Sequence, residues 1–238
     1  MNVVARPLPD IPVRYFQKGL EQKPAWFYRT PAGQAAVTEL RERRLANYNF
    51  YLGESDWRLA AIELSQLAHG LEISVHPRRK HDLETGDRRY SLLFEALIYH
   101  SSAVSLFRQE ASLKSSTSNQ LKIGLELSYF SQALGFLRQA HPDFHNAVST
   151  ALMIKARSEA VEIFTRLNSD RDAFYEHAYL GHLYLGSDDL GRAVNHISQA
   201  LEIGKRLGQG ADKSYLLAFN LFMEIAKIAG LLPETANS

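Results

Sequence analysis

The chain of 238 residues is long enough for one large domain that buries most of its apolar surface without disulfides or structural metals. Its 27 Lys and Arg residues against 26 Asp and Glu residues give a net charge of +1, which excludes a protein-wide field that would steer it onto nucleic acid or an anionic membrane. It contains no cysteine, which excludes disulfide frameworks and every zinc or redox site built on thiolates.

Residues 1–32 are predicted to form an extended, proline-rich arm. Five of the eight prolines fall here, and each fixes φ and removes a backbone donor. The arm is too apolar for a solvated tail, so we expect it to lie along the helices and bury the rings of Trp26, Phe27 and Tyr28. No apolar signal-peptide core lies in residues 1–20, and no stretch reaches the roughly 18 uncharged apolar residues of a membrane span. We therefore expect a cytoplasmic protein.

Residues 33–232 are predicted to form a single all-α domain, followed by a tail at 233–238. Apolar residues recur at helical spacing, as Leu93, Leu97 and Val104 do with His100 on the same face, and no run alternates between apolar and polar residues. Capping residues such as Asp56 stand just before several of these segments. The predicted helices are 34–52, 56–74, 89–111, 118–140, 143–168, 172–186, 189–207 and 213–230.

Two segments of the chain repeat each other at a constant offset of 133 residues. Tyr51-Leu52-Gly53 with Asp56 and Ala60 matches Tyr184-Leu185-Gly186 with Asp189 and Ala193. This offset is close to four periods of the tetratricopeptide repeat, in which small residues let two antiparallel helices approach closely. The pattern predicts antiparallel helical hairpins stacked as a short curved solenoid.

The order of several motifs resembles the Bro domain of the Alix and Bro family. The matching stretches are Phe94-Glu95-Ala96, Leu121-Lys122-Ile123, Ala151-Leu152-Met153-Ile154 and Leu190-Gly191, and the similarity covers about Glu39 to Lys205. Bro domains are usually longer and have a β-containing N-terminal part, so the resemblance implies a reduced form. A generic array of tetratricopeptide-like hairpins explains the same pattern equally well.

The resemblance implies a partner groove at Leu152, Met153 and Ile154. In the Bro family this position receives an amphipathic helix from a membrane-remodelling ESCRT-III subunit. Three adjacent apolar residues span about 200° of a helix, so at least one of them should face away from the core. The alternative is that all three are core residues.

Two further surfaces are candidates for partner binding. The helix predicted at 213–230 is apolar on nearly every side, so Phe219, Phe222 and Met223 would contact a partner or a second copy, unless the N-terminal arm covers them. A basic loop could meet phosphate, an acidic helix or a membrane surface, although nearby acidic residues partly cancel its charge and a solvated loop is the simpler interpretation. The residues of this basic loop are Arg78, Arg79, Lys80, Arg88 and Arg89.

Little in the sequence indicates catalysis. His141 and His145 lack a third metal ligand, and His100 lies on an apolar face where a hydrogen-bonded core residue is expected. We expect no metal and no cofactor, and no aromatic residues interleave the basic cluster as single-stranded nucleic acid would require. The predicted function is a non-catalytic protein–protein adaptor that binds an amphipathic helix. The alternatives are a tetratricopeptide-like scaffold or chaperone for an extended peptide and, third, an enzyme.

Overall fold

The computed structural model describes residues 17–20, 22–23, 25–75, 87–140 and 147–207, together with Asn220 and Met223. Every regular element in these ranges is helical, which confirms the all-α prediction. The elements are η1 (Ala25–Arg29), α2 (Pro31–Gly53), α3 (Trp57–Val75), α4 (Asp87–Leu113), α5 (Thr117–Ala140), α6 (Ala147–Arg166), α7 (Asp170–Leu185) and α8 (Leu190–Arg206). No helix of the described part is long and apolar enough to cross a bilayer.

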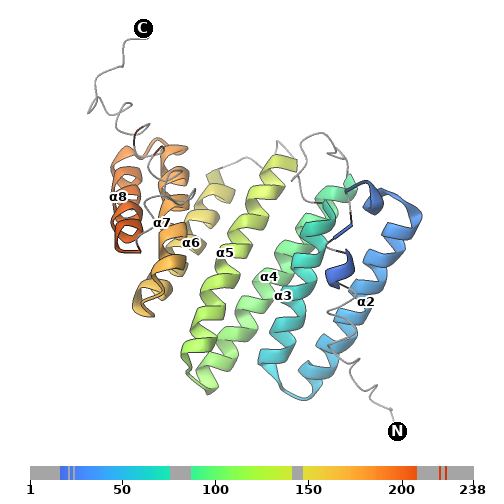
Figure 1. Cartoon of the computed structure of the whole chain (residues 1–238). Helices are drawn as coiled ribbons and strands as arrows, with labels where there is room; N and C mark the ends of the chain where they lie inside the picture. The colour runs from blue at the N-terminus through green and yellow to red at the C-terminus, as the bar shows by residue number, and fades with distance from the viewer. Residues whose placement is uncertain are drawn as a thin grey trace. The chain divides into compact units, whose positions relative to one another are not determined.

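The contacts divide the chain into two compact units, residues 1–145 and 146–238. The sequence had predicted one domain over 33–232. In the first unit α2 packs on α3, α3 on α4, and α4 on α5, so that successive antiparallel helices lie side by side (Figure 1). Helix α3 supplies the centre of this unit through Leu67, Ala68 and Leu71, which are fully buried.

The N-terminal segment covers the first hairpin with helical turns where we expected an extended arm. Residues 17–20 and η1 are helical, and the Tyr28 hydroxyl donates a hydrogen bond to the Leu20 carbonyl. Tyr28 is buried against α3 and Phe27 is half-buried, as predicted. Trp26 was predicted to be buried and is instead 60% exposed. One turn of 3₁₀ helix points consecutive side chains about 120° apart, so three adjacent rings cannot all face the core.

Gly33 in the first turn of α2 is required by the close approach of η1. A Cβ atom there would lie 2.1 Å from the Phe27 carbonyl oxygen, whereas a Cβ at Gly53 would meet nothing within 4 Å. We expect Gly33→Ala to lower the free energy of unfolding by about 2 kcal/mol, because backbone must move to relieve the overlap. Gly53→Ala should be neutral or stabilising by up to about 1 kcal/mol. Urea unfolding of the two variants measures both, and equal stabilities would contradict the prediction.

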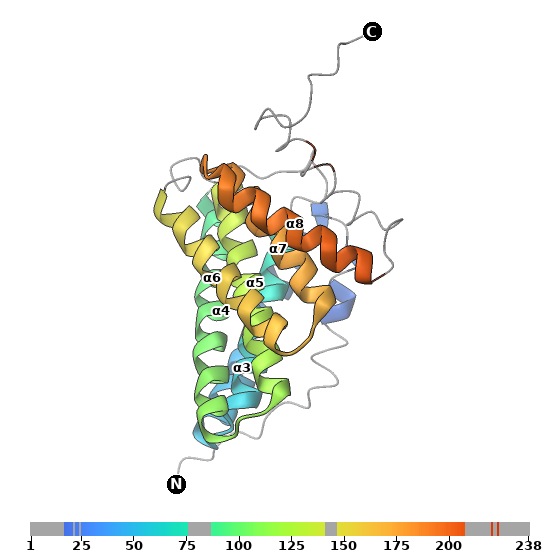
Figure 2. The same ribbon diagram turned by 90° about the vertical axis from the view of Figure 1, so that its left-hand side faces the viewer.

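The second unit contains α6, α7 and α8, with α6 packed on α7 and α7 packed on α8 (Figure 2). Its core combines Leu180 and Tyr184 of α7 with Ala193 and Ile197 of α8. A Cβ at Gly181 would lie 2.5 Å from the Ile197 side chain, so the glycine lets these two helices approach closely. This confirms the small-residue contact predicted from the repeat.

The same interhelical turn connects α2 to α3, α6 to α7 and α7 to α8. In each, one residue with a positive φ precedes the N-terminal capping residue of the next helix: Ser55 at 59°, Asn168 at 55° and Asp188 at 58°. The backbone N–H of the following residue then reaches back to the preceding helix, as Asp56 does to the Tyr51 carbonyl at 2.9 Å and Asp189 to the Tyr184 carbonyl at 3.0 Å. These two turns are 133 residues apart, so the repeat seen in the sequence is also a repeat of structure.

Each of these three hairpins also carries a buried or partly buried polar pair at the same place, with partners 19 residues apart. Arg44 donates to Glu63 at 2.7 Å and Arg157 donates to Glu176 at 2.8 Å, and all four side chains are buried. In the third hairpin the corresponding residues are His177 and His196, whose Nδ1 atoms lie 2.9 Å apart. The offset of 113 residues between Arg44 and Arg157 therefore marks a second repeat, which the sequence analysis missed.

Candidate functional site

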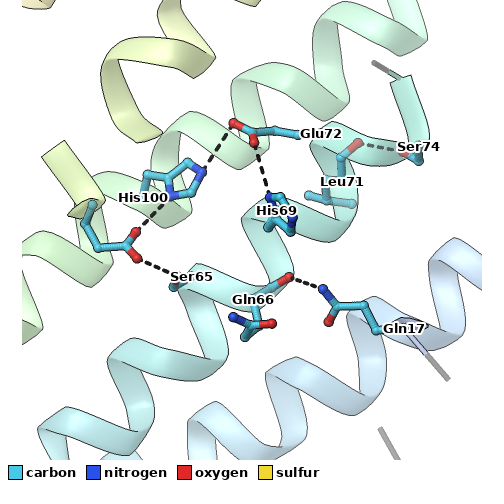
Figure 3. Close-up of polar contacts among 9 residues, drawn as sticks. Gln17, Ser65, Gln66, His69, Leu71, Glu72, Ser74 and His100 are labelled. Carbon is cyan, nitrogen blue, oxygen red and sulfur yellow. Dashed lines mark hydrogen bonds and ion pairs between the residues drawn. The ribbon is translucent and has the colours of Figure 1, made fainter. Parts of the chain in front are cut away.

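A chain of buried polar groups connects α3, α4 and α5. His100 of α4 is fully buried and lies between two carboxylates, with its Nδ1 atom 2.9 Å from Glu126 of α5 and its Nε2 atom 3.3 Å from Glu72 of α3. Figure 3 shows Glu72 between the rings of His69 and His100, with Ser65 on the same helix. The Ser65 hydroxyl donates to the Glu126 oxygen that does not face His100. Side chains from three helices thus join in one hydrogen-bonded chain.

Opposite charges stabilise the buried hydrogen-bonded groups of Glu72, His100 and Glu126. Burial by itself would lower the pKa of His100, but the hydrogen bonds and negative charges of Glu126 and Glu72 raise it to about 9. The imidazole is therefore protonated at neutral pH, and each ring nitrogen donates to one carboxylate. Burial alone would raise the pKa of Glu72, but His100 and His69 outweigh it and lower that pKa.

The polar chain reaches the surface at two aromatic rings. The ring of His69 on α3 lies 6.4 Å from the ring of Tyr129 on α5, and the ring of Tyr129 lies 5.7 Å from that of His100. The His69 side chain is 50% exposed and Tyr129 is 37% exposed. We call the surface formed here the α3–α5 face, and its residues are the half-buried Ser65 and the exposed His69 and Tyr129.

The buried part of the site orders the exposed part. His100 has no exposed surface, so it cannot itself reach a substrate. What it does is fix the carboxylate of Glu126, which in turn orients Ser65, so that α3 and α5 are tied together across α4. No group of three His, Asp or Glu side chains in the described ranges is placed to hold a metal ion. The arrangement places two exposed rings beside a network of buried hydrogen bonds.

Sequence analysis found only one member of this site. It predicted that His100 is a hydrogen-bonded core residue, and the structure confirms this. It missed Glu72 and Glu126, which lie 28 and 26 residues from His100 on neighbouring helices. A signal existed: Glu72 and Glu126 each interrupt the apolar side of a predicted helix, and a carboxylate on such a side needs a buried cation.

The predicted partner groove on α6 divides into one exposed and two covered residues. Leu152 is 42% exposed, Met153 is 8% exposed, and Ile154 is half-buried against the cluster of Leu180, Tyr184, Ala193 and Ile197. Four residues before Leu152, Val148 is also exposed. The helical period therefore places Val148 and Leu152 on one face, and these are the apolar anchors that α6 offers.

The other predicted surfaces are only partly within the described residues. Arg89 is buried in α4, where burial lowers its pKa, so it does not belong to a solvated basic loop. Arg88 is in the same helix, in the part of α4 whose side chains are not described, and Arg78, Arg79 and Lys80 lie outside the described residues. Met223 is helical and half-buried, while Phe219 and Phe222 lie outside the described residues, as do His141 and His145.

Comparison with known proteins gives a likeness among solved structures. No protein-family model matches the sequence, and no curated protein matches it. Among solved structures the chain is similar to BtubC (BKLC) from P. vanneervenii, with a TM-score of 0.42 and 16% sequence identity, over 97% of this chain and 85% of that one.

Proposed function

We propose that this chain is a non-catalytic scaffold that binds a segment of another protein. The observation that carries the proposal is the threefold use of one helix–turn–helix unit, with the same turn and a buried or partly buried polar pair at the same place. Stacked units of this kind bury their apolar sides against one another and leave extended surfaces for binding. Such a fold supports interaction with a chain more readily than enclosure of a small substrate.

The α3–α5 face is the surface that best fits this role. Tyr and His rings supply apolar contact area together with a polar edge, which is why aromatic residues dominate the binding energy of many interfaces. Tyr129 and His69 are exposed, yet both rings rest on the fixed chain of Glu72, His100 and Glu126. A partner would meet a surface that is already ordered, so little conformational entropy is lost on binding.

A second candidate is an adaptor that receives an amphipathic helix on α6, as the Bro resemblance implies. Val148 and Leu152 support it because they are exposed four residues apart, the spacing at which a partner helix can pack. Under this alternative the partner would resemble an ESCRT-III subunit, and membrane association would come through that partner. Ile154 cannot test the idea, since its replacement would disturb the core of the second unit.

Photo-crosslinking in the native cell tests both candidates at once. A benzoylphenylalanine side chain would replace Tyr129, Leu152 or, as a control at a more exposed apolar site of α4, Leu113. We expect a discrete protein adduct from position 129 and none from position 113. An adduct from position 152 alone would favour the amphipathic-helix adaptor. Absence of adducts at both 129 and 152 would contradict the scaffold function.

A further inference from the structure

Arg89, in the first turn of α4, is a buried cation without an acidic partner among the described residues. It is only 5% exposed, and its Nε atom is enclosed by protein and has no hydrogen-bond partner. No described residue forms an ion pair or a hydrogen bond with its guanidinium. Burial alone lowers the pKa of Arg89, so no neighbouring carboxylate offsets the cost of desolvating this charge.

The other arginines with an enclosed Nε atom show what is missing at Arg89. Arg41, Arg44 and Arg157 also leave this atom without a hydrogen bond, but each pairs through a terminal nitrogen with a glutamate of another helix. Arg44 and Arg157 are buried as deeply as Arg89, at 1% and 5% exposed. Where this protein buries a guanidinium, an oxyanion accompanies it, and at Arg89 the described part of the chain does not supply one.

The position of Arg89 in the helix is a second reason to expect an anion. Helix α4 begins at Asp87, and the N–H groups of a first helical turn have no carbonyl partner inside their own helix. The helix dipole places a partial positive charge there, which disfavours a cation. Long side chains on a helix lean toward its N-terminus, so the guanidinium extends toward these N–H groups. A helix N-terminus together with an arginine is a common setting for phosphate oxygens.

Apolar residues close the inner side of this position. One turn after Arg89 on the same side of α4, Leu93 is buried against Phe136 and Leu137 of α5, and Val75 of α3 packs on the same cluster. Helices α3 and α5 both pack along α4 (Figure 1). The small exposed fraction of Arg89 leaves access for a small anion but not for the broad surface of a bilayer or a folded protein.

We propose that Arg89 and the first turn of α4 bind a phosphate group. The terminal nitrogens of the guanidinium would donate to two phosphate oxygens, and the N–H groups of the first turn to the others. A phosphate monoester carries about −1.5 to −2 charges at neutral pH, which offsets both the buried cation and the helix dipole, whereas a carboxylate brings only one. This site goes beyond the scaffold function and does not rest on it.

Isothermal titration calorimetry with inorganic phosphate, at an ionic strength fixed with sodium chloride, tests the proposal on the full chain. We expect Arg89→Gln to weaken phosphate binding by about tenfold or more, because charge-assisted hydrogen bonds are lost. Arg89→Lys keeps the charge but loses the planar pair of donors, so its loss should be smaller. Arg108→Gln is the matched control, since it removes an exposed arginine from the same helix, and it should bind phosphate as the unchanged chain does.

A further variant separates phosphate binding from a purely structural role of Arg89. Arg89→Met removes the charge and keeps much of the volume, so in chloride alone its midpoint of thermal unfolding should match or exceed that of the unchanged chain. Phosphate should raise the midpoint of the unchanged chain and not that of the variant. Strong destabilisation of Arg89→Met in chloride would mean that the guanidinium already has a partner within the chain, and would overturn the proposal.

Titrations with acetate and with N-acetyl-phosphoserine amide define the ligand. Binding of inorganic phosphate alone identifies a free anion, and binding of the phosphoserine compound as well identifies a phosphorylated side chain as a second source. Both results support the site. Acetate binding as tightly as phosphate, equal losses in Arg89→Gln and Arg108→Gln, or no measurable phosphate binding to the unchanged chain would each overturn it.

Discussion

Replacing Arg44 by alanine should lower the free energy of unfolding by about 3–5 kcal/mol. The substitution would leave Glu63 buried with its main cationic partner gone, and the Glu63 carboxylate is held at 2.7 Å by that guanidinium. Gln17 would also lose the hydrogen bond that it receives from Arg44. Chemical denaturation followed by circular dichroism measures the change.

The neighbouring residue provides the control. Arg43 forms a partly exposed ion pair with Glu39 on the same helix, and Arg43→Ala should cost less than about 1 kcal/mol. The double substitution Arg44→Met with Glu63→Leu should recover much of the loss, because it removes both charges together. Equal destabilisation by Arg44→Ala and Arg43→Ala would show that the buried pair is not what holds α2 to α3.

The two units should respond to pH in opposite directions. In the second unit, burial and then the charge of His196 lower the pKa of His177 to about 4, below its ordinary value of 6.5. Burial and the positive charge of Arg192 lower the pKa of His196 as well. Between pH 4 and 6.5 the unfolded chain therefore binds more protons than the native one. The free energy of unfolding of the second unit should fall by about 2–3 kcal/mol as the pH falls from 6.5 to 4.

In the first unit the sign is reversed. The pKa of His100 is raised to about 9, so the native state holds its proton more tightly than the unfolded state. The stabilisation is complete below pH 6.5 and is lost as the pH rises from 6.5 to 9, by about 3 kcal/mol. The groups that face His100 across the helix packing are Glu72 and Glu126, with His69 beside Glu72.

Unfolding free energies measured across this pH range distinguish the two effects. The acid-side loss should disappear in His177→Gln and the alkaline-side loss in His100→Gln, each at the cost of lower stability at neutral pH. His182 on α7 is exposed, so His182→Gln should leave both sides of the profile as they are. A profile in which His177→Gln retains the full loss below pH 6.5 would contradict the assignment of this loss to His177.

The helix positions were predictable from sequence because periodic apolar residues and capping residues act locally. The helix predicted at 189–207 is observed as Leu190–Arg206. It begins after Asp189, whose side chain accepts a hydrogen bond from the Arg192 N–H as an N-cap should. The N-terminal arm was less predictable, because prolines exclude long helices but permit the short turns seen at η1. Contacts between helices decide its conformation.

Most of the candidate site could not be predicted from the sequence, because it also depends on contacts between helices. Glu72, His100 and Glu126 come together only when three helices adopt one particular rotation and stagger. The Arg157–Glu176 pair was missed in the same way, because little except these two residues and a few core positions repeats at the 113-residue offset. In contrast, the apolar run of Leu152, Met153 and Ile154 was expected to have at least one residue facing away from the core, and Leu152 does so.

The polar pairs inside these hairpins fix the position of one helix along the axis of its neighbour. Two leucine-lined helices can slide past each other by one turn, about 5.4 Å, with little change in buried area. Sliding α2 on α3, or α6 on α7, by that distance would strand a guanidinium and a carboxylate apart from each other inside the protein. Each of these two hairpins thus admits one alignment, which is set when the protein folds.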